Sequence, residues 1–146
     1  MNIRRATIDD FVVLYDLASK TPEFRASATE PFMSLDELRY CIGNPASVFL
    51  LAETEKSVVG FIYANTQDVE RPERYACLVY LAVHPEHRRQ GIAKRLYQQC
   101  EEELKQRGIS YIYGWAKSGG KIIDFMKQEG FTEGHQYVWM DKKLEK

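Results

Sequence analysis

The most informative segment of the chain reads Leu81-Ala82-Val83-His84-Pro85-Glu86-His87-Arg88-Arg89-Gln90-Gly91-Ile92-Ala93. The apolar run that ends at Val83 is typical of a strand buried on both faces. Pro85 indicates a turn, and from Gln90 onward apolar and charged residues recur at the spacing of an amphipathic helix. A buried strand joined to a helix by a short loop is a building unit of α/β proteins, so we expect a mixed sheet flanked by helices.

The start of the helix near Gly91 predicts an anion site. The first N–H groups of a helix have no partner within the helix, and the aligned peptide dipoles add positive potential there. Gly91 and Ala93 leave the backbone uncovered, so a phosphate can approach the amides. Arg88 and Arg89 can reach phosphate oxygens, and an arginine can pair with them through two nitrogens. A solvated turn is the alternative, but the place between a buried strand and an amphipathic helix favours diphosphate binding.

The patterns on either side of this segment predict the other elements. Upstream we expect a strand, two helices, a hairpin and a long strand over residues 3–6, 7–21, 34–42, 47–65 and 74–83. Downstream we expect a long helix, a strand, a helix and a last strand over residues 90–107, 109–116, 121–129 and 137–144. The sequence shows neither a repeat nor a linker, so we expect residues 1–146 to form a single domain.

Composition narrows the class of protein. Hydrophobic residues make up 45% of the 146 residues, which is enough to form a hydrophobic core. The 20 basic and 21 acidic residues nearly cancel, which argues against a nucleic-acid-binding protein. No apolar run reaches the ~18 residues of a membrane-spanning helix, and Met1–Arg5 does not lead into a secretory signal. Cys41, Cys77 and Cys100 are widely spaced, so we expect reduced, buried thiols in a cytoplasmic protein.

Two motifs resemble those of a known family. Residues 88–93 fit the signature (Gln/Arg)-x-x-Gly-x-(Gly/Ala), and residues 125–131, Phe-Met-Lys-Gln-Glu-Gly-Phe, are similar to a later aromatic-x-x-x-x-Gly-Phe segment. With these motifs the chain resembles the GNAT superfamily of acetyl-CoA-dependent N-acetyltransferases over nearly its whole length. The resemblance implies a mixed, mostly antiparallel twisted sheet that is flanked by about four helices and splays between its central strands.

The resemblance also implies where acetyl-CoA, the acetyl donor, lies. Its diphosphate would bind the loop residues Arg88, Arg89, Gln90, Gly91, Ile92 and Ala93. Its pantetheine arm would run like an added strand along Leu81, Ala82 and Val83. The amide of Val83 would stabilise the negative charge that develops on the thioester oxygen, an effect worth about 3 kcal/mol for one donor. The implied reaction is direct attack by a primary amine of a small molecule, a peptide N-terminus or a lysine.

Three positions depart from the family pattern. The usual tyrosine is Met126, the usual asparagine is Gly119, and the glutamate of some protein-acetylating members is Gly114. The proton donor and acceptor therefore cannot be carried over. Tyr80, beside the expected thioester, is our catalytic candidate, and His84 and Tyr137 are other conceivable substitutes; a packing or turn role competes for each. Water chains could also carry the protons. A non-catalytic acyl-CoA-binding or regulatory module of the same fold is the alternative function.

A glycine-rich turn precedes the last predicted helix. Residues 114–121 are similar to a phosphate-binding P-loop but lack its first glycine and its Ser or Thr, because Trp115 and Ile122 stand there. Ser118 and Lys121 could still form a second basic rim for the coenzyme, or simply belong to a strand-to-helix turn. His84 and His87 have neither a nearby cysteine nor a third histidine, so we expect no metal site.

The acceptor site is expected in the loop between the first two predicted helices. Phe24, Arg25, Glu30 and Phe32 lie in that loop, and aromatic walls with an acidic residue suit a cationic amine. We expect an amine acceptor as the partner, with neither nucleic acid nor membrane. A homodimer agrees with the resemblance, although no segment of the sequence indicates an interface.

Overall fold

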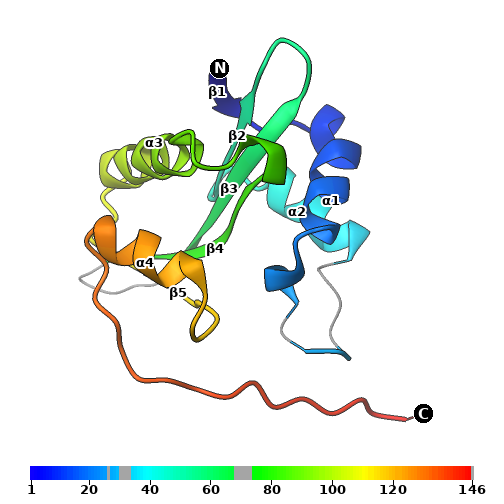
Figure 1. Cartoon of the computed structure of the whole chain (residues 1–146), viewed down its shortest axis with the longest axis vertical. Helices are drawn as coiled ribbons and strands as arrows, with labels where there is room; N and C mark the ends of the chain where they lie inside the picture. Colours follow the sequence, from blue (N-terminus) through cyan, green and yellow to red (C-terminus); the bar gives the residue numbers. More distant parts are fainter. Residues whose placement is uncertain (26, 30–33, 68–73, 146) are drawn as a thin grey trace.

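The computed structural model describes residues 1–25, 27–29, 34–67 and 74–145 (Figure 1). Its strands are β1 (Asn2–Arg5), β2 (Val48–Glu53), β3 (Val58–Gln67), β4 (Tyr75–Val83) and β5 (Tyr111–Gly114). Its helices are α1 (Phe11–Ser19), α2 (Leu35–Gly43), α3 (Ile92–Gln106) and α4 (Lys121–Gln128). Short 3-10 turns lie at η1 (Ile8–Asp10), η2 (Pro22–Phe24) and η3 (Pro85–His87). None of the helices within these ranges is both long and apolar enough to cross a membrane.

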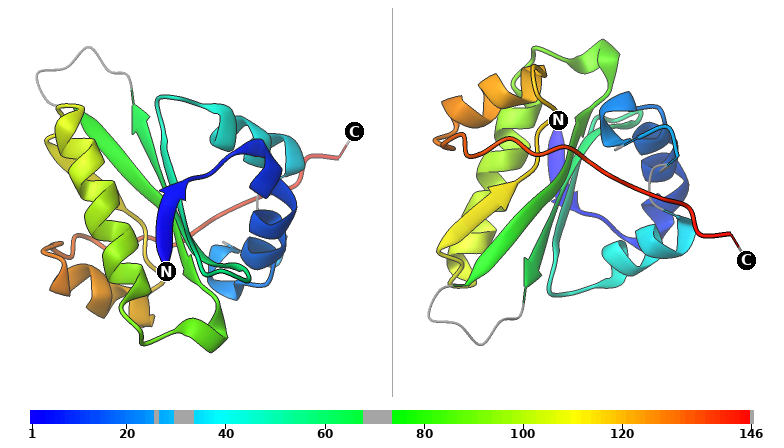
Figure 2. Two further views of the ribbon diagram at one scale, coloured as in Figure 1. Left: turned by 90° about the horizontal axis from the view of Figure 1, so that it is seen from above. Right: turned by 90° about the horizontal axis from the view of Figure 1, so that it is seen from below.

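The strands form one twisted sheet in the order β1-β2-β3-β4-β5. Neighbours are antiparallel from β1 to β4, whereas β4 and β5 are parallel. Helices α1 and α2 cover one face of the sheet, and α3 and α4 cover the other (Figures 1 and 2). The predicted mixed, mostly antiparallel sheet with four flanking helices is therefore confirmed.

Alternation of side chains along the strands divides the core into two layers. In β2, Val48 and Leu50 pack in the layer beneath α3, whereas Phe49 and Leu51 pack beneath α1 and α2. Successive side chains of a strand point to opposite faces, so a strand covered on both faces reads as a continuous apolar run. Phe49 stacks on Phe61 of β3 at 5.7 Å between ring centroids, which ties the second layer together.

The sheet opens between β4 and β5. Residues 75–78 of β4 pair with residues 111–114 of β5, and β4 then continues to Val83 while β5 has ended at Gly114. The register between β3 and β4 shifts beside Val79, where the extra residue forms a bulge. Because of that bulge, Leu78 faces the α3 layer and Tyr80 faces the α1–α2 layer. The expected splay between central strands is thus confirmed, and a bulge marks it.

A partly buried ion pair fixes the start of the chain against α1. Both Nη atoms of Arg4 donate to the Asp10 carboxylate at 2.8 Å, and the Thr7 amide donates to the same carboxylate at 2.8 Å. The hydrogen bonds from Arg4 lower the pKa of Asp10 below its usual value. Thr7 and Asp10 form a capping box, which opens the short turn η1 before α1 begins at Phe11.

The prediction of a last strand over residues 137–144 is wrong. Residues 131–145 lie outside any helix or strand and run as an extended tail away from α4 (Figure 1). A strand exists only where its backbone groups pair with a neighbour, and this tail leaves its own sheet instead. The strand predicted over residues 109–116 is also shorter in the structure, where it is β5. The reason is again pairing, because β4 pairs with β5 only as far as Leu78. The three cysteines are free thiols as expected, although Cys77 is half-buried rather than buried.

Candidate functional site

The site begins at the edge of β4 that β5 leaves open. The amide of His84 donates to the Val59 carbonyl at 2.7 Å, which makes this pair a hydrogen-bonded one. Hydrogen-bonded and non-hydrogen-bonded pairs alternate along antiparallel strands, so Leu81 and Val83 turn their N–H and C=O groups away from β3. Those groups face the opening. Of the three residues predicted to hold an extended ligand arm, Ala82 differs, because its backbone pairs with Phe61.

The turn from β4 to α3 is held by its own side chains. The Nδ1 atom of His84 accepts a hydrogen bond from the Glu86 amide at 3.2 Å, and the His87 amide donates to the His84 carbonyl at 2.8 Å. The Nε atom of Arg88 donates to the Val83 carbonyl at 3.0 Å. His84 therefore serves the turn, and Arg88 is fixed where the open edge meets the helix.

The first turn of α3 presents its amides to solvent. Gly91 is the N-cap with φ of 77°, a left-handed conformation that favours glycine, and none of the described side chains caps the turn. A Cβ atom added at Gly91 would meet nothing within 4 Å, so the amides beyond it are accessible. Ile92 is buried in the core and anchors this turn, and the residues before it are exposed: Arg88, Arg89, Gln90 and Gly91. The structure thus brings the predicted phosphate-binding residues together in one exposed loop before α3.

Arg89 adopts an unusual backbone conformation in this loop. Its φ is 62°, in the left-handed region that residues other than glycine rarely occupy. Such a conformation costs on the order of 1–2 kcal/mol. Backbone strain of this kind is concentrated at binding and catalytic sites, where the surrounding fold maintains it. Together with Gly91, it gives the loop two left-handed residues just before the helix.

The turn after β5 opens at the same edge of the sheet. Because β4 and β5 are parallel, the loops that follow them both lie at their carboxyl ends, as Figure 2 shows. Ser118 and Lys121 are exposed in and after this turn, as a second rim would require. Gly119 has φ of 76°, so this departure from the family pattern occupies a left-handed position.

The other two departures lie in packed surroundings. Met126 is only 9% exposed and belongs to the core cluster under α3. A Cβ atom at Gly114 would lie 3.0 Å from the Leu78 carbonyl oxygen and 3.4 Å from the Met126 methyl group. A longer side chain at Gly114 would therefore disturb the pairing of β4 and β5. Neither position can supply a proton carrier.

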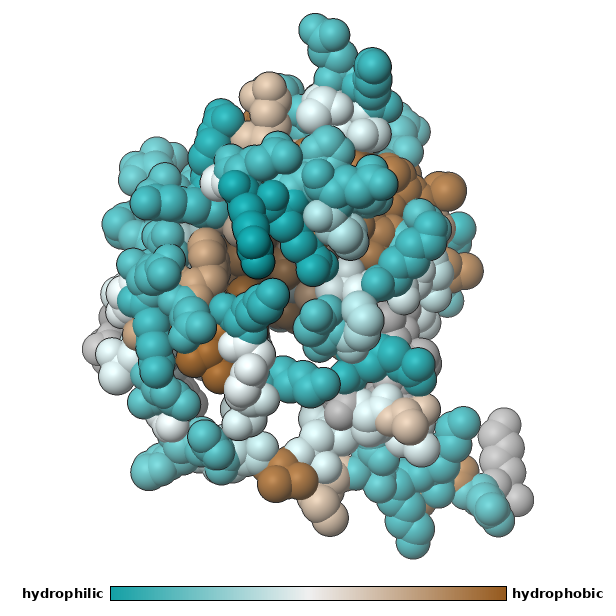
Figure 3. Space-filling view, in the orientation of Figure 1, coloured by the Kyte–Doolittle hydropathy of each residue, from teal (hydrophilic) through white to brown (hydrophobic). Residues whose placement is uncertain are grey.

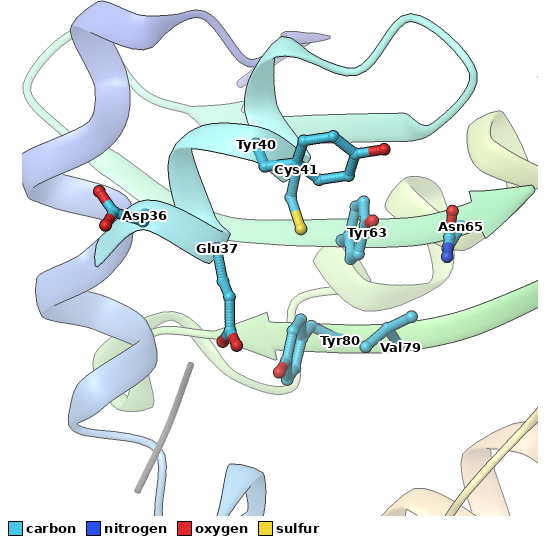
Figure 4. Close-up of a pocket in the computed structure, with 8 residues that line it drawn as sticks. All are labelled: Asp36, Glu37, Tyr40, Cys41, Tyr63, Asn65, Val79 and Tyr80. Carbon is cyan, nitrogen blue, oxygen red and sulfur yellow. The ribbon is translucent and has the colours of Figure 1, made fainter. Parts of the chain in front are cut away.

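An open hollow of about 480 Å³ lies on the other side of the bulge, between α2 and the strands β3 and β4 (Figure 4). It combines two carboxylates with three tyrosine rings, and its lining comprises Asp36, Glu37, Tyr40, Cys41, Tyr63, Asn65, Val79 and Tyr80. The Glu37 side chain extends from α2 toward Tyr80 (Figure 4). The hollow suits a cationic group, because carboxylates and aromatic faces both attract positive charge.

Tyr80 stands at the boundary between the hollow and the open edge of β4. Its ring lies 4.7 Å from that of Phe24 and 6.3 Å from that of Tyr63, between centroids. Burial, together with the nearby Cys41 and Glu37, raises the pKa of Tyr80 to about 12. The phenol therefore keeps its proton at neutral pH and can act as a donor.

The predicted acceptor residues are only partly brought to this place. Phe24 packs beneath Tyr80, whereas Arg25 is exposed and donates from Nη2 to the Ala28 carbonyl at 3.2 Å. Glu30 and Phe32 lie outside the described residues. Sequence reasoning missed Asp36 and the other α2 residues of the hollow. The available signal was the spacing of Glu37 and Cys41, one turn apart on a single helix face.

A metal centre finds no support in the described ranges, where no cluster of three or more His, Cys, Asp or Glu side chains is suited to a metal ion. The Glu37 carboxylate and the Cys41 thiol of the hollow instead have neighbouring groups of the protein as partners. The Glu37 carboxylate accepts from the Ser34 amide at 3.0 Å in a capping box at the start of α2. The Cys41 thiol has its pKa raised by burial, and Tyr63 lies beside it.

Comparison with known proteins places this fold in a class of acetyltransferases. Residues 11–131 match the acetyltransferase (GNAT) family. An acetyltransferase of Pectobacterium atrosepticum is 30% identical over 144 residues, which span 99% of this chain and 96% of that protein. The chain belongs to the GNAT family of acetyltransferases.

Solved structures share the fold over almost the whole chain. The aminoglycoside 6'-N-acetyltransferase AAC(6')-Ih of Acinetobacter baumannii is 25% identical with a TM-score of 0.74, covering 99% of both chains. A transcriptional regulator of Bacillus halodurans C-125 is 18% identical with a TM-score of 0.77, covering 97% of this chain and 99% of that one. The similarity to the transcriptional regulator shows only that the two proteins share a fold.

Proposed function

We propose that this protein transfers the acetyl group of acetyl-CoA to a cationic primary amine. One observation carries the proposal: the open backbone edge at Leu81 and Val83 continues, through the turn held by Arg88, into the uncapped amides of α3. An acetyl-CoA molecule has an extended amide-bearing arm attached to a diphosphate. A free strand edge and a free helix start, joined in that order, match those two parts.

The donor would be held mainly by backbone groups. The amides of the first turn of α3 would bind the diphosphate, with Arg88 and Arg89 adding charge. The Nε contact of Arg88 leaves the other guanidinium nitrogens to donate to phosphate oxygens. Leu81 and Val83 would pair with the arm, and the outward Val83 amide would face the thioester oxygen. A donor in that position stabilises the transition state by about 3 kcal/mol.

The acceptor would enter the hollow between α2 and β3–β4. Asp36 and Glu37 would attract an ammonium group, and the tyrosine rings would form its walls. An alkyl ammonium has a pKa near 10.4 and must lose a proton before the amine can attack. The similar solved structures include proteins named as aminoglycoside acetyltransferases, whose acceptors are cationic amines. This supports small cationic amines as the first acceptors to test, ahead of peptide amines.

Tyr80 is the residue we assign to proton transfer. The ammonium first loses one proton to solvent, and the neutral nitrogen then forms a bond to the acetyl carbon. The carbon–sulfur bond breaks, the nitrogen releases a second proton to solvent as the amide forms, and the leaving thiolate needs a proton. The Tyr80 phenol, protonated at neutral pH and beside the bulge at the open edge, would donate it. Solvent can then return a proton to the phenolate.

A non-catalytic acyl-CoA-binding module is the second candidate, because Met126 and Gly119 replace the usual proton carriers. One experiment separates the two. Thiol release from acetyl-CoA is measured over a panel of small cationic amines, lysine peptides and neutral amines, beside calorimetric binding of CoA. Turnover that prefers cationic amines supports the enzyme; tight CoA binding with no turnover on any amine supports the module. Absence of CoA binding would contradict both.

A further inference from the structure

The inner wall of the hollow between α2 and the strands β3 and β4 is apolar. Tyr63 and Cys41 are only 4% and 8% exposed, and Val79 lines the hollow with them. The Tyr63 hydroxyl donates a hydrogen bond to the Cys41 sulfur, and burial raises the pKa of both groups, so both are uncharged at neutral pH. Their polar atoms are thus already paired. A hydroxyl-rich ligand would lose its water against this wall without gaining hydrogen bonds from it.

The two carboxylates of the hollow differ in their surroundings. Among the described residues that line it, Glu37 is the carboxylate that extends toward Tyr80 (Figure 4). Asp36 is exposed, and its Oδ1 atom lies 3.9 Å from Nη1 of Arg39. Asp36 can attract cations from solvent, but the neighbouring positive charge offsets part of its own. The hollow is therefore suited to balance one positive charge next to Tyr80 rather than several along its length.

The place of Glu37 sets the direction of a bound amine. The nitrogen and the sulfur are bonded to the same carbon during the transfer, so the nitrogen must react close to the proposed acid Tyr80. The rest of the acceptor then extends past the Tyr63 ring toward Asn65, which lies on the other side of that ring from Glu37 (Figure 4). Hydrophilic residues cover most of the face that Figure 3 shows. The aromatic lining of the hollow therefore offers an apolar group contacts that such a surface does not.

We infer that the acceptor is a primary amine that carries one positive charge on an apolar alkyl or aryl body, rather than a polyamine or an amino sugar. The inference rests on the proposed acetyl transfer and narrows its acceptor. Glu37 pairs with the ammonium group before it loses its proton, and the rings of Tyr63 and Tyr40 contact the apolar body. A second ammonium group on that body would lie against the uncharged wall, where its desolvation is not compensated.

A matched pair of amines tests the inference on the unmodified protein. Hexylamine and cadaverine have the same length, but cadaverine ends in a second ammonium group where hexylamine ends in a methyl group. Thiol release from acetyl-CoA is measured with these two amines, with phenethylamine and with the aminoglycoside kanamycin. We expect hexylamine and phenethylamine to exceed cadaverine and kanamycin in kcat/KM by roughly tenfold.

The outcomes separate the inference from the proposed function. Equal or better turnover of cadaverine or kanamycin would overturn the inference while acetyl transfer stands. Turnover of none of the four amines, with CoA still bound in a calorimetric titration, would contradict the proposed function and the inference with it.

Glu37→Gln tests the carboxylate that pairs with the amine. Glutamine has the same shape and can keep the capping box of α2, so the melting temperature should hardly change. We expect KM for hexylamine to rise roughly tenfold, because a charged hydrogen bond is lost, and the dissociation constant for CoA to stay the same. Glu55→Gln, in the turn between β2 and β3 and outside the hollow, makes the same change of charge and is the control. Equal KM values for the two variants would overturn the assignment of Glu37.

Two variants of Tyr40 test the apolar contact. Tyr40 lines the hollow and is 70% exposed on α2, so its replacement leaves the core intact. We expect KM for hexylamine to be roughly threefold higher in Tyr40→Ser than in Tyr40→Phe, because phenylalanine keeps the ring that covers the alkyl chain. The same KM in both variants would contradict an apolar acceptor body in contact with this wall.

Discussion

The Nε atom of Arg88 donates to the carbonyl of Val83 across 3.0 Å, joining the end of β4 to the basic loop before α3. Val83 is also the residue whose amide faces the open edge of the sheet. One side chain thus joins the two surfaces that we propose as the acetyl-CoA site. This contact explains how an exposed arginine can be ordered before any ligand binds.

Arg88→Ala should raise the dissociation constant for CoA roughly tenfold, because a charged hydrogen bond to phosphate and the anchor on Val83 are lost together. The free energy of unfolding should hardly change, since Arg88 is exposed. Calorimetric titration with CoA measures the first quantity and thermal unfolding the second. Lys105→Ala, at the far end of α3, is the control and should bind CoA normally. If the two variants bound CoA with equal affinity, Arg88 would not be part of the donor site.

Gly91→Asp and Gly91→Asn form a matched pair at the N-cap of α3. Both side chains cap helices well and tolerate the left-handed conformation of Gly91, and both have open space. They differ in charge. We expect Asp to weaken CoA binding at least tenfold more than Asn, because a carboxylate competes with the diphosphate for the same amides. Similar affinities of the two variants would show that the anion lies elsewhere.

Tyr80→Phe should lower kcat by about 10²-fold, if its hydroxyl protonates the leaving thiolate. Tyr63→Phe, which loses a neighbouring hydroxyl beside Cys41, should change kcat little. Because burial raises the pKa of Tyr80 to about 12, the acid remains protonated up to that pH and should cause no loss of activity between pH 7 and pH 10. Steady-state rates over this pH range check both statements. A Tyr80→Phe variant with the original kcat would exclude the assigned role.

Asp10→Asn should destabilise the fold by about 1–3 kcal/mol at pH 7, because it breaks the ion pair with Arg4. The pKa of Asp10 in the folded protein is lowered, so its contribution is present above the unfolded value of 3.8 and is lost as the pH falls through the folded value. The difference in unfolding free energy between the two proteins should therefore be full at neutral pH and shrink below about pH 4. Denaturant unfolding at pH 7 and pH 3 measures it. A constant difference would mean that the carboxylate charge contributes nothing.

The unit that we propose as the donor site could be predicted from the sequence because it is local. The apolar run ending at Val83, the turn at Pro85 and the glycine at 91 follow one another along the chain, and each has a strong conformational preference. The structure has the same strand, turn and helix in these places. The bulge at Val79, which turns Tyr80 toward the acidic hollow, carries no such local signal.

Features that depend on distant contacts were predicted less well. The acidic hollow joins Asp36 and Glu37 of α2 to Tyr63 and Tyr80 of two strands, so only the folded chain assembles it. The strand expected over residues 137–144 has the right residue types, but pairing needs a partner edge, and the tail leaves its own sheet.

A crystal structure of the protein with CoA is the most direct test of the central claim. We expect the diphosphate on the amides of residues 91–94, with Arg88 in contact, and the pantetheine arm paired with Leu81 and Val83. A cofactor bound at another surface would contradict this account. So would a structure in which side chains fill the opening between β4 and β5 while the coenzyme is bound.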